Sequence, residues 1–469
     1  MPTSTLNPPP AVADSLPASV AAAPAEFLPA TAHAGPSDRT RFNVLCASHA
    51  VIDIFPIFFT TLAWALQDRL GLTNAQYAWL FIATPIFSGL TQPLFAWLTD
   101  KHDTRLCGPI GMVVGATCIA SIGLAQNFWQ LAVLQAIGVM ATGMYHPITT
   151  AVAGQIGTRF LHNGRGQAIG LFIAAGMVGQ AFGPRLAAWI NHFNGGTGMP
   201  WLVVLIPPSI LAAGVLHAYT RRLPHRHANH HELRASVSRA ESRRRWRVIA
   251  LLTAQNSLRF TTNVGLFAMF NVWAMSKLLA TPFESETARA AAASALTSEL
   301  ASALTIGMGI TVVLGGRIVR RGAERTPLFV YSVLGAIGCA SMGYIGDWGV
   351  EAAGGPVWWA LIPMHLAGWL STMGFFATFP IATSLAQRLQ PGHTGVVTSL
   401  MMGVGWGISA AAAPAAVLFF GNVPLALAPT LEPWRINMGF LGFAALLLIA
   451  GALTLFIPRD MVRQAAEHH

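Results

Sequence analysis

Twelve apolar runs of about 20 residues recur along the chain, and they constrain its fold more than any other feature. The chain is 54% hydrophobic and only 10% charged, too apolar for a soluble protein of this length. Lipid offers the backbone no hydrogen-bond partner, so we expect an all-α membrane protein with twelve transmembrane helices. The predicted spans are 42–65, 75–99, 106–125, 129–153, 166–190, 200–219, 247–274, 295–316, 327–346, 357–386, 394–420 and 435–457.

The net charge of +10 could indicate a nucleic-acid partner, but its distribution follows the expected membrane topology. If both termini lie inside, 22 of the 28 basic residues fall in cytoplasmic segments, nine of them between Arg221 and Arg247. The positive-inside rule therefore predicts a multi-pass inner (plasma) membrane protein with both termini in the cytoplasm. The expected partners are the lipid bilayer, a small-molecule substrate and protons, with no nucleic acid.

The segments between the apolar runs divide the chain into two sets of six spans. Residues 1–38 lack the basic start of a signal peptide and resemble a disordered cytoplasmic tail. The N-terminal half covers 39–219, a basic linker 220–246, the C-terminal half 247–458 and a cytoplasmic tail 459–469. The linker histidines could bind a metal, but contact with anionic lipid headgroups is the simpler interpretation. The four cysteines show no metal-ligand spacing, so we predict neither a disulfide nor a metal site.

The two halves share an internal similarity. The segment from Gly166 to Pro184 in span five echoes the segment from Gly395 to Pro414 in span eleven. This pattern predicts pseudo-symmetric halves with a substrate site between them near the midplane.

Span five also carries a run of regularly spaced small residues. Gly170, Gly179, Gly183 and Pro184 follow a G-x8-G-x3-G-P spacing, with Gly176 on the same helix face as Gly179 and Gly183. Such a face lets a neighbouring backbone approach closely, and the proline offers a kink. The spacing resembles the fifth-helix antiporter motif of the major facilitator superfamily. An ordinary packing face is the alternative.

Other segments resemble the same superfamily and, within it, the fosmidomycin resistance protein family. Asp100 and Arg105 match the signature of the loop between spans two and three, which in the family acts as a gating latch; a membrane-edge charge pair is the alternative. The resemblance to the fosmidomycin resistance family rests on His49-Ala-Val-Ile-Asp53, Gln92-Pro, Thr99-Asp-Lys, Pro109-Ile-Gly-Met112, Tyr145-His146-Pro147 and Gly403-Val-Gly-Trp406-Gly407. One departure matters, because Ile148 stands where relatives commonly carry a glutamate.

Ionisable residues inside spans are the candidates for function. Asp53 is the one acid that we place well inside a span, and His49 lies one helical turn before it. His146 is expected at a similar depth in span four. We predict that these three groups exchange protons, the alternatives being a structural ion pair for Asp53 and hydrogen-bonding core residues for the histidines.

The substrate candidates lie mainly in span seven. Asn256, Arg259 and Asn263 are spaced to share one face, and Arg259 is expected near the midplane. This cation would suit an anionic substrate, or it would neutralise Asp53 across the pseudo-two-fold axis. Tyr145 and Trp406 are further substrate-binding candidates.

These features predict a secondary active transporter with the major facilitator fold. Proton-coupled export of a small polar or anionic compound by alternating access is the main hypothesis, with export implied by the resemblance. An uptake symporter on the same fold is the closest alternative, and a non-transporting receptor is a weaker one. We find no nucleophile with its base, metal cluster or nucleotide motif, so we expect no enzyme activity and no cofactor. The family resemblance implies a monomer.

Overall fold

The structure is a computed structural model that describes residues 36–99, 106–157, 159–161, 164–221, 223, 238–279, 281–319, 322–390 and 394–467. Within these residues the regular secondary structure is all helical. The longer helices are α1 (Asp38–Ile52), α2 (Phe58–Leu70), α3 (Asn74–Thr99), α4 (Cys107–Ala120), α5 (Phe128–Gly157), α6 (Gly164–Gly196), α7 (Ile206–Thr220), α8 (Arg239–Leu278), α9 (Glu286–Ile318), α10 (Arg325–Ala353), α11 (Ile362–Thr372), α12 (Thr378–Leu389), α15 (Ala412–Phe419), α16 (Pro433–Thr454) and α17 (Arg459–Glu467).

Short helical segments extend or join several of these helices. Two are π-helical turns, which complete the spans that contain α11 with α12 and α13 with α15. The short segments are η1 (Ser121–Leu124), η2 (Met199–Leu205), η4 (Trp358–Leu361), η5 (Met373–Ala377), α13 (Thr394–Ser399), η7 (Leu400–Val404), α14 (Gly405–Ile408), η8 (Ser409–Ala411) and η9 (Ala428–Thr430).

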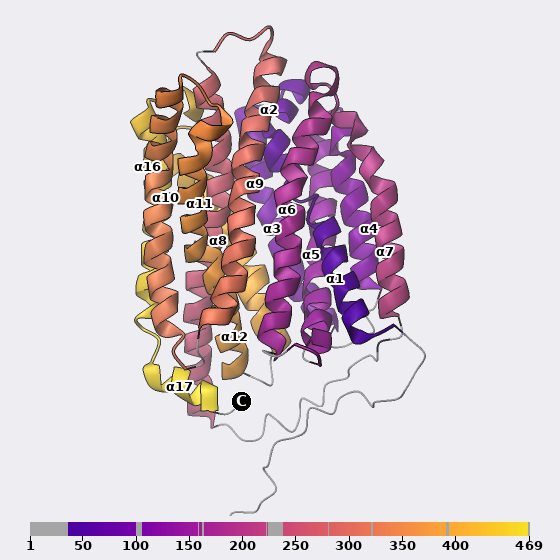
Figure 1. Cartoon of the computed structure of the whole chain (residues 1–469), viewed down its shortest axis with the longest axis vertical. Helices are drawn as coiled ribbons and strands as arrows, with labels where there is room; N and C mark the ends of the chain where they lie inside the picture. The colour runs from indigo at the N-terminus through magenta and orange to yellow at the C-terminus, as the bar shows by residue number, and fades with distance from the viewer. Residues whose placement is uncertain are drawn as a thin grey trace, which may run out of the picture. The chain divides into compact units, whose positions relative to one another are not determined.

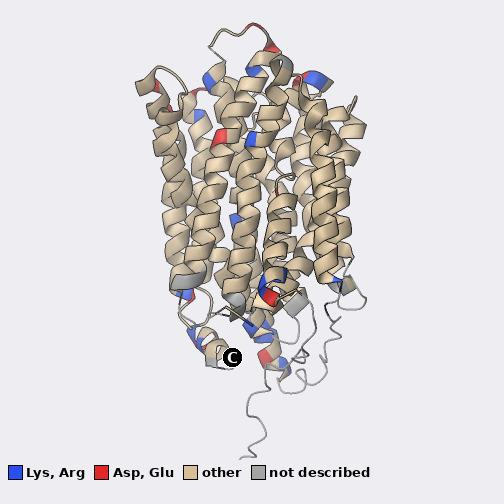
Figure 2. Cartoon of the chain, turned by 45° about the vertical axis from the view of Figure 1, so that its right-hand side comes forward, with Lys and Arg blue, Asp and Glu red and all other residues tan. Residues whose placement is uncertain are grey.

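Ten helical segments in the described part of the chain are long and apolar enough to cross a membrane. They correspond to ten of the twelve predicted spans. The other two are the first span, which α1 and α2 form together, and the seventh span, which is α8. The first span is interrupted between α1 and α2, and α8 carries buried polar side chains along its length. Figure 2 shows the charged residues gathered mainly at the two ends of the helices, as expected of an integral multi-pass membrane protein.

The interruption in the first span has a local cause. Pro56 lacks a backbone N–H and its ring crowds the preceding turn, so a regular helix cannot run through it. The backbone N–H groups of Ile54 and Phe55 donate to the carbonyl oxygens of Val51 and Ile52, three residues earlier in each case. Helix α2 begins at Phe58. Asp53 is the C-cap of α1. The break therefore places the carboxylate at a helix end inside the bundle.

The helices before the linker and those after it lie mostly on opposite sides of Figure 1, with α6 and α9 side by side between them. α9 also contacts α2, and α3 contacts α14. The linker lies largely outside the described residues, so the predicted domain boundaries stay predictions.

Close contact between α1 and α6 depends on the glycines of the fifth-span motif. A Cβ atom at Gly179 would overlap the carbonyl group of Ala50, and one at Gly183 would overlap that of Ile54. At Gly170, by contrast, a Cβ would have no neighbour within 4 Å. The motif thus contains two positions of backbone contact and one open position.

Candidate functional site

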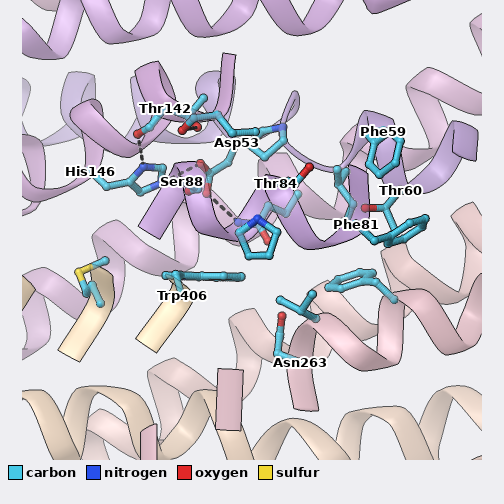
Figure 3. A pocket seen from close by; sticks show the side chains of 18 of the residues that line it. Asp53, Phe59, Thr60, Phe81, Thr84, Ser88, Thr142, His146, Asn263 and Trp406 are labelled. Atoms are coloured by element: carbon cyan, nitrogen blue, oxygen red, sulfur yellow. Dashed lines mark hydrogen bonds and ion pairs between the residues drawn. The ribbon is translucent and has the colours of Figure 1, made fainter. Parts of the chain in front are cut away.

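A cavity of about 150 Å³ lies between the two sets of helices. Its wall includes Asp53, residues of α2, α3, α5 and α6, and residues of α8, η7 and α14. In Figure 3, Asp53 and His146 lie on one side of the cavity, while Asn263 and Trp406 lie on the other. The lining residues are Asp53, Pro56, Ile57, Phe59, Thr60, Phe81, Thr84, Pro85, Ser88, Gln92, Val139, Thr142, His146, Gln180, Asn263, Val264, Phe267, Met402 and Trp406.

Asp53 contacts three polar side chains from three helices. Nε2 of His146, on α5, lies 3.1 Å from Oδ1, and Nε2 of His49, on α1, lies 3.3 Å from Oδ2. Gln180, on α6, donates a hydrogen bond of 3.0 Å to Oδ2. The carboxylate is only 1% exposed. The structure therefore brings the three predicted proton-coupling residues together.

The second nitrogen of each imidazole fixes where its hydrogen lies. Nδ1 of His49 is 2.7 Å from the Phe172 carbonyl oxygen, and Nδ1 of His146 is 2.6 Å from that of Thr142. A carbonyl oxygen only accepts hydrogen bonds, so each Nδ1 carries a hydrogen. In a neutral ring Nε2 then presents a lone pair to the carboxylate. Each contact of Nε2 with Asp53 is attractive only when a proton lies between the two atoms, and the two contacts together can hold two protons.

Gly176 makes room for this arrangement on α6. A Cβ atom there would lie 2.6 Å from both Oδ2 of Asp53 and Nε2 of His49. The phenyl ring of Phe172, one turn earlier on the same helix, stacks on His49 with the ring centroids 4.1 Å apart. The glycine face of α6 thus serves two purposes, since it admits both the backbone of α1 and the side chains of His49 and Asp53.

The structure does not bring Arg259 to Asp53, so the predicted pairing across the pseudo-two-fold axis is absent from it. Arg259 is 0% exposed and is not among the residues that line the cavity. Its Nη2 donates to the Leu328 carbonyl oxygen at 3.2 Å and to Oγ of Ser332 at 3.0 Å, both on α10. The side chain is directed toward α10 because α8 packs with this face inside the second set of helices. The predicted contact of Arg259 with substrate stays a prediction.

The other substrate candidates are divided between the cavity and the helix packing. Asn263 and Trp406 line the cavity. Asn256 instead donates to the Met401 carbonyl oxygen at 2.5 Å. Tyr145 is buried with its hydroxyl 2.7 Å from Oγ of Ser48. Their roles in binding stay predictions, and Asp100 and Arg105 of the predicted latch lie outside the described residues.

Two polar groups inside the helices were not among the residues predicted from the sequence. Gln180 lies one turn after Gly176 inside the glycine motif. An amide side chain in a run of small and apolar residues could have indicated a polar contact inside the membrane. Glu299 lies well inside α9, which begins at Glu286, whereas the predicted span began only at residue 295. The prediction that Asp53 is the one acid well inside a span is therefore wrong. The Ala-rich start of α9 concealed the true beginning of the helix.

The cluster of His49, Asp53 and His146 also has the grouping of a metal site. The ligand atoms of His49, Asp53 and His146 all lie within 4.8 Å of one another, a grouping that could hold a metal. Spacing along the sequence could not reveal it, because His146 is far from the other two residues. Proton flux in liposomes, measured with and without a chelator, separates a metal site from a site that binds protons.

Comparison with known proteins agrees with this architecture. The family model described as Major Facilitator Superfamily matches residues 45–414. The fosmidomycin resistance protein of Escherichia coli (strain K12) is 31% identical over 189 residues, which cover 39% of this chain and 44% of that protein. The multidrug resistance protein MdtG of Escherichia coli O1:K1 / APEC is 30% identical over 126 residues, or 25% and 29% of the two chains. The matches span less than half the length of these curated relatives.

Solved structures of transporters share the fold. A proton dependent oligopeptide transporter gives a TM-score of 0.64 at 13% identity and covers 92% of this chain and 100% of its own. A bacterial homolog of the human lysosomal transporter Spinster, in an inward-facing and unoccupied conformation, gives 0.57 at 13% identity, with coverages of 93% and 98%. The predicted fold class is confirmed, and the chain belongs to the Major Facilitator Superfamily.

Proposed function

We propose that this protein is a proton-coupled exporter of a small polar compound that works by alternating access. The observation that carries the proposal is the contact of Asp53 with two histidines at the wall of a cavity between the two sets of helices. The names of two relatives, a fosmidomycin resistance protein and a multidrug resistance protein, support export. The distribution of arginines supports an inner-membrane location with both termini in the cytoplasm, and the family resemblance supports a monomer.

Protons would reach Asp53 through His146. The side chain of His146 is 18% exposed and lines the cavity, whereas that of His49 is 3% exposed and lies behind the carboxylate. A proton taken up from the cavity by Nε2 of His146 lies directly against Oδ1 of Asp53. His49 then provides the second position, shielded by Phe172.

The net charge of Asp53, His49 and His146, together called the proton site, links proton binding to substrate binding. With no shared proton, the carboxylate and the two neutral imidazoles together carry a charge of −1, and with two protons they carry +1. An exported substrate that exchanges with protons must bind the proton-free form. That form attracts cationic or hydrogen-bond-donating groups, whereas an anionic substrate would bind the loaded form and travel with its protons.

The cavity wall also offers groups for a polar substrate. The side-chain oxygens of Gln92 and Asn263 are buried and have no hydrogen-bond partner in the part of the chain that the structure describes. Such acceptors cost free energy when left unpaired, so a bound compound with N–H or O–H groups would satisfy them. Trp406, stacked on Phe260 with centroids 4.8 Å apart, presents an aromatic wall beside them.

A reconstituted system tests the proposal. Purified protein is placed in liposomes that contain a pH-sensitive dye, and proton flux is recorded with phosphonates, sugars and cationic drugs, each with and without a chelator. Proton movement opposite to one substrate class, unchanged by the chelator, is the expected result. Movement in the same direction as substrate would establish the symporter instead.

The Asp53→Asn variant identifies the coupling residue. We expect its proton flux to fall to the level of protein-free liposomes while the protein still purifies as a folded species. Asp68→Asn is the matched control, because Asp68 is exposed and the amide oxygen can still accept the hydrogen bond from Thr287. Full coupled transport by Asp53→Asn would remove the carboxylate from the mechanism.

A further inference from the structure

A second cavity, of about 420 Å³, lies at the opposite end of the second set of helices from the α8–α9 connection. Three arginines line it: Arg325 at the start of α10, and Arg459 and Arg463 on α17. Phe329, Leu455 and Val462 supply apolar parts of the same wall. No Asp or Glu is among its described lining residues.

The position of this cavity coincides with a membrane boundary. The candidate span formed by α10 begins at Arg325, and the one formed by α16 ends at Thr454. Both helices therefore leave the apolar region at the cavity, which is where lipid headgroups lie. Figure 2 shows several basic residues gathered at this end of the molecule, near the C-terminus.

Helix α17 has the two-sided character of a segment that lies along such a boundary. Met461, Val462 and Ala465 are buried in an apolar cluster with Ile457. Arg459 and Arg463 are exposed and one helical turn apart, so their guanidinium groups share one face. In Figure 1, α17 lies near the lower ends of the helices, and it contacts α12.

The acid nearest in sequence is already engaged elsewhere. Asp460 accepts a hydrogen bond of 2.6 Å from Nη2 of Arg244 on α8, and this hydrogen bond lowers the pKa of the Asp460 carboxyl. Asp460 is not part of the cavity wall. Arg325 donates to the Leu455 carbonyl oxygen, a neutral acceptor that does not balance its positive charge.

We propose that this cavity binds the headgroup phosphate of an anionic phospholipid. Guanidinium groups match phosphate oxygens in charge and geometry, and three of them converge here. A soluble anion would use the arginines alone, whereas a lipid also uses the apolar wall at the membrane boundary. Binding would relieve the repulsion among the three cations and so stabilise the docking of α17 against the bundle.

Phosphatidylglycerol and phosphatidylcholine distinguish this site from general lipid solvation. The apparent dissociation constant of each lipid for the purified full chain in detergent is measured by native mass spectrometry, and Tm is measured in parallel. We expect phosphatidylglycerol to bind more tightly and to raise Tm. Each arginine near an anionic lipid contributes about 1 kcal/mol, so the double variant Arg459→Gln/Arg463→Gln should bind about 30-fold more weakly.

Arg243→Gln/Arg247→Gln is the matched control, because these exposed arginines on α8 carry the same charge and are not part of the cavity wall. It should retain the affinity of the natural chain, and Arg459→Lys/Arg463→Lys should retain part of it. The proposal is overturned if both Gln double variants bind equally, if phosphatidylcholine binds equally well, or if inorganic phosphate reproduces the rise in Tm. Lipid binding is measured without transport, so its outcome is independent of the proposed export.

Discussion

At the scale of single residues, the environment of Asp53 separates the roles of the two histidines. Both imidazoles have Nδ1 anchored on a backbone carbonyl and Nε2 directed at the carboxylate. Only His146 also lines the cavity. In the proposed mechanism, the pair therefore combines one imidazole that exchanges protons with the cavity and one that is enclosed by the protein.

His146→Gln should interrupt the proton route while leaving the substrate site largely intact. We expect transport driven by a pH gradient to fall strongly, while substrate exchange in the absence of a gradient continues. Counterflow of labelled substrate and dye-reported proton flux in the same liposomes measure the two activities. A variant that loses both in equal measure would show that His146 acts in substrate binding or folding.

Arg259 is fully buried within the second set of helices. Its Nε and Nη1 groups are buried without a hydrogen-bond partner in the part of the chain that the structure describes. A buried charge with incomplete pairing carries a desolvation cost of several kcal/mol, which an apolar side chain of similar length would remove. Arg259→Met should therefore keep or raise Tm and retain transport. Loss of substrate binding in a variant of unchanged Tm would restore the role predicted from the sequence.

At the scale of elements, the packing of α6 on α1 is set by which glycines face a backbone. Gly179 meets Ala50, whose carbonyl cannot move without displacing α1, whereas Gly170 has free space. The two glycines belong to the same sequence motif. Their different surroundings make them a matched pair for measuring the cost of a single methyl group.

Gly179→Ala should destabilise the protein by at least about 1 to 3 kcal/mol, because it overpacks a backbone contact. Gly170→Ala should be neutral or stabilising by up to about 1 kcal/mol, because alanine favours a helix. Thermal unfolding in detergent measures both. Equal Tm values for the two variants would contradict the close approach of α1 and α6.

At the scale of the whole molecule, the proposed transport by alternating access requires that the two sets of helices move relative to each other. The contacts of α6 with α9 and of α3 with α14 join the two sets. Alternating access opens and closes such contacts around a fixed site. The membrane face toward which the site opens in each conformation depends on how the chain is oriented in the bilayer.

Cysteine labelling tests the orientation. Thr73, between α2 and α3, is predicted to lie outside, and Ser238, before α8, is predicted to lie in the cytoplasm. With the four native cysteines replaced, a membrane-impermeant maleimide should label Thr73→Cys in intact cells. Ser238→Cys should react only after permeabilisation. The reverse pattern would invert the proposed topology.

Much of the architecture could be predicted from the sequence because its causes are local. The number of spans follows from apolar runs, since a helix in lipid must satisfy its own backbone. His49 and Asp53 were placed together by the helical period alone. The start of α9 and the position of Glu299 were missed, because alanine-rich sequence marks the edge of a span weakly.

The sequence by itself determined the fold class, the family resemblance and the candidate polar residues Asp53, His49 and His146 inside the membrane. Only the tertiary structure decided which of these groups meet: His146 and Gln180 reach Asp53, while Arg259 is directed toward α10. The physical reason is that periodicity shows which residues share a helix face. Packing between helices distant in sequence decides what that face contacts.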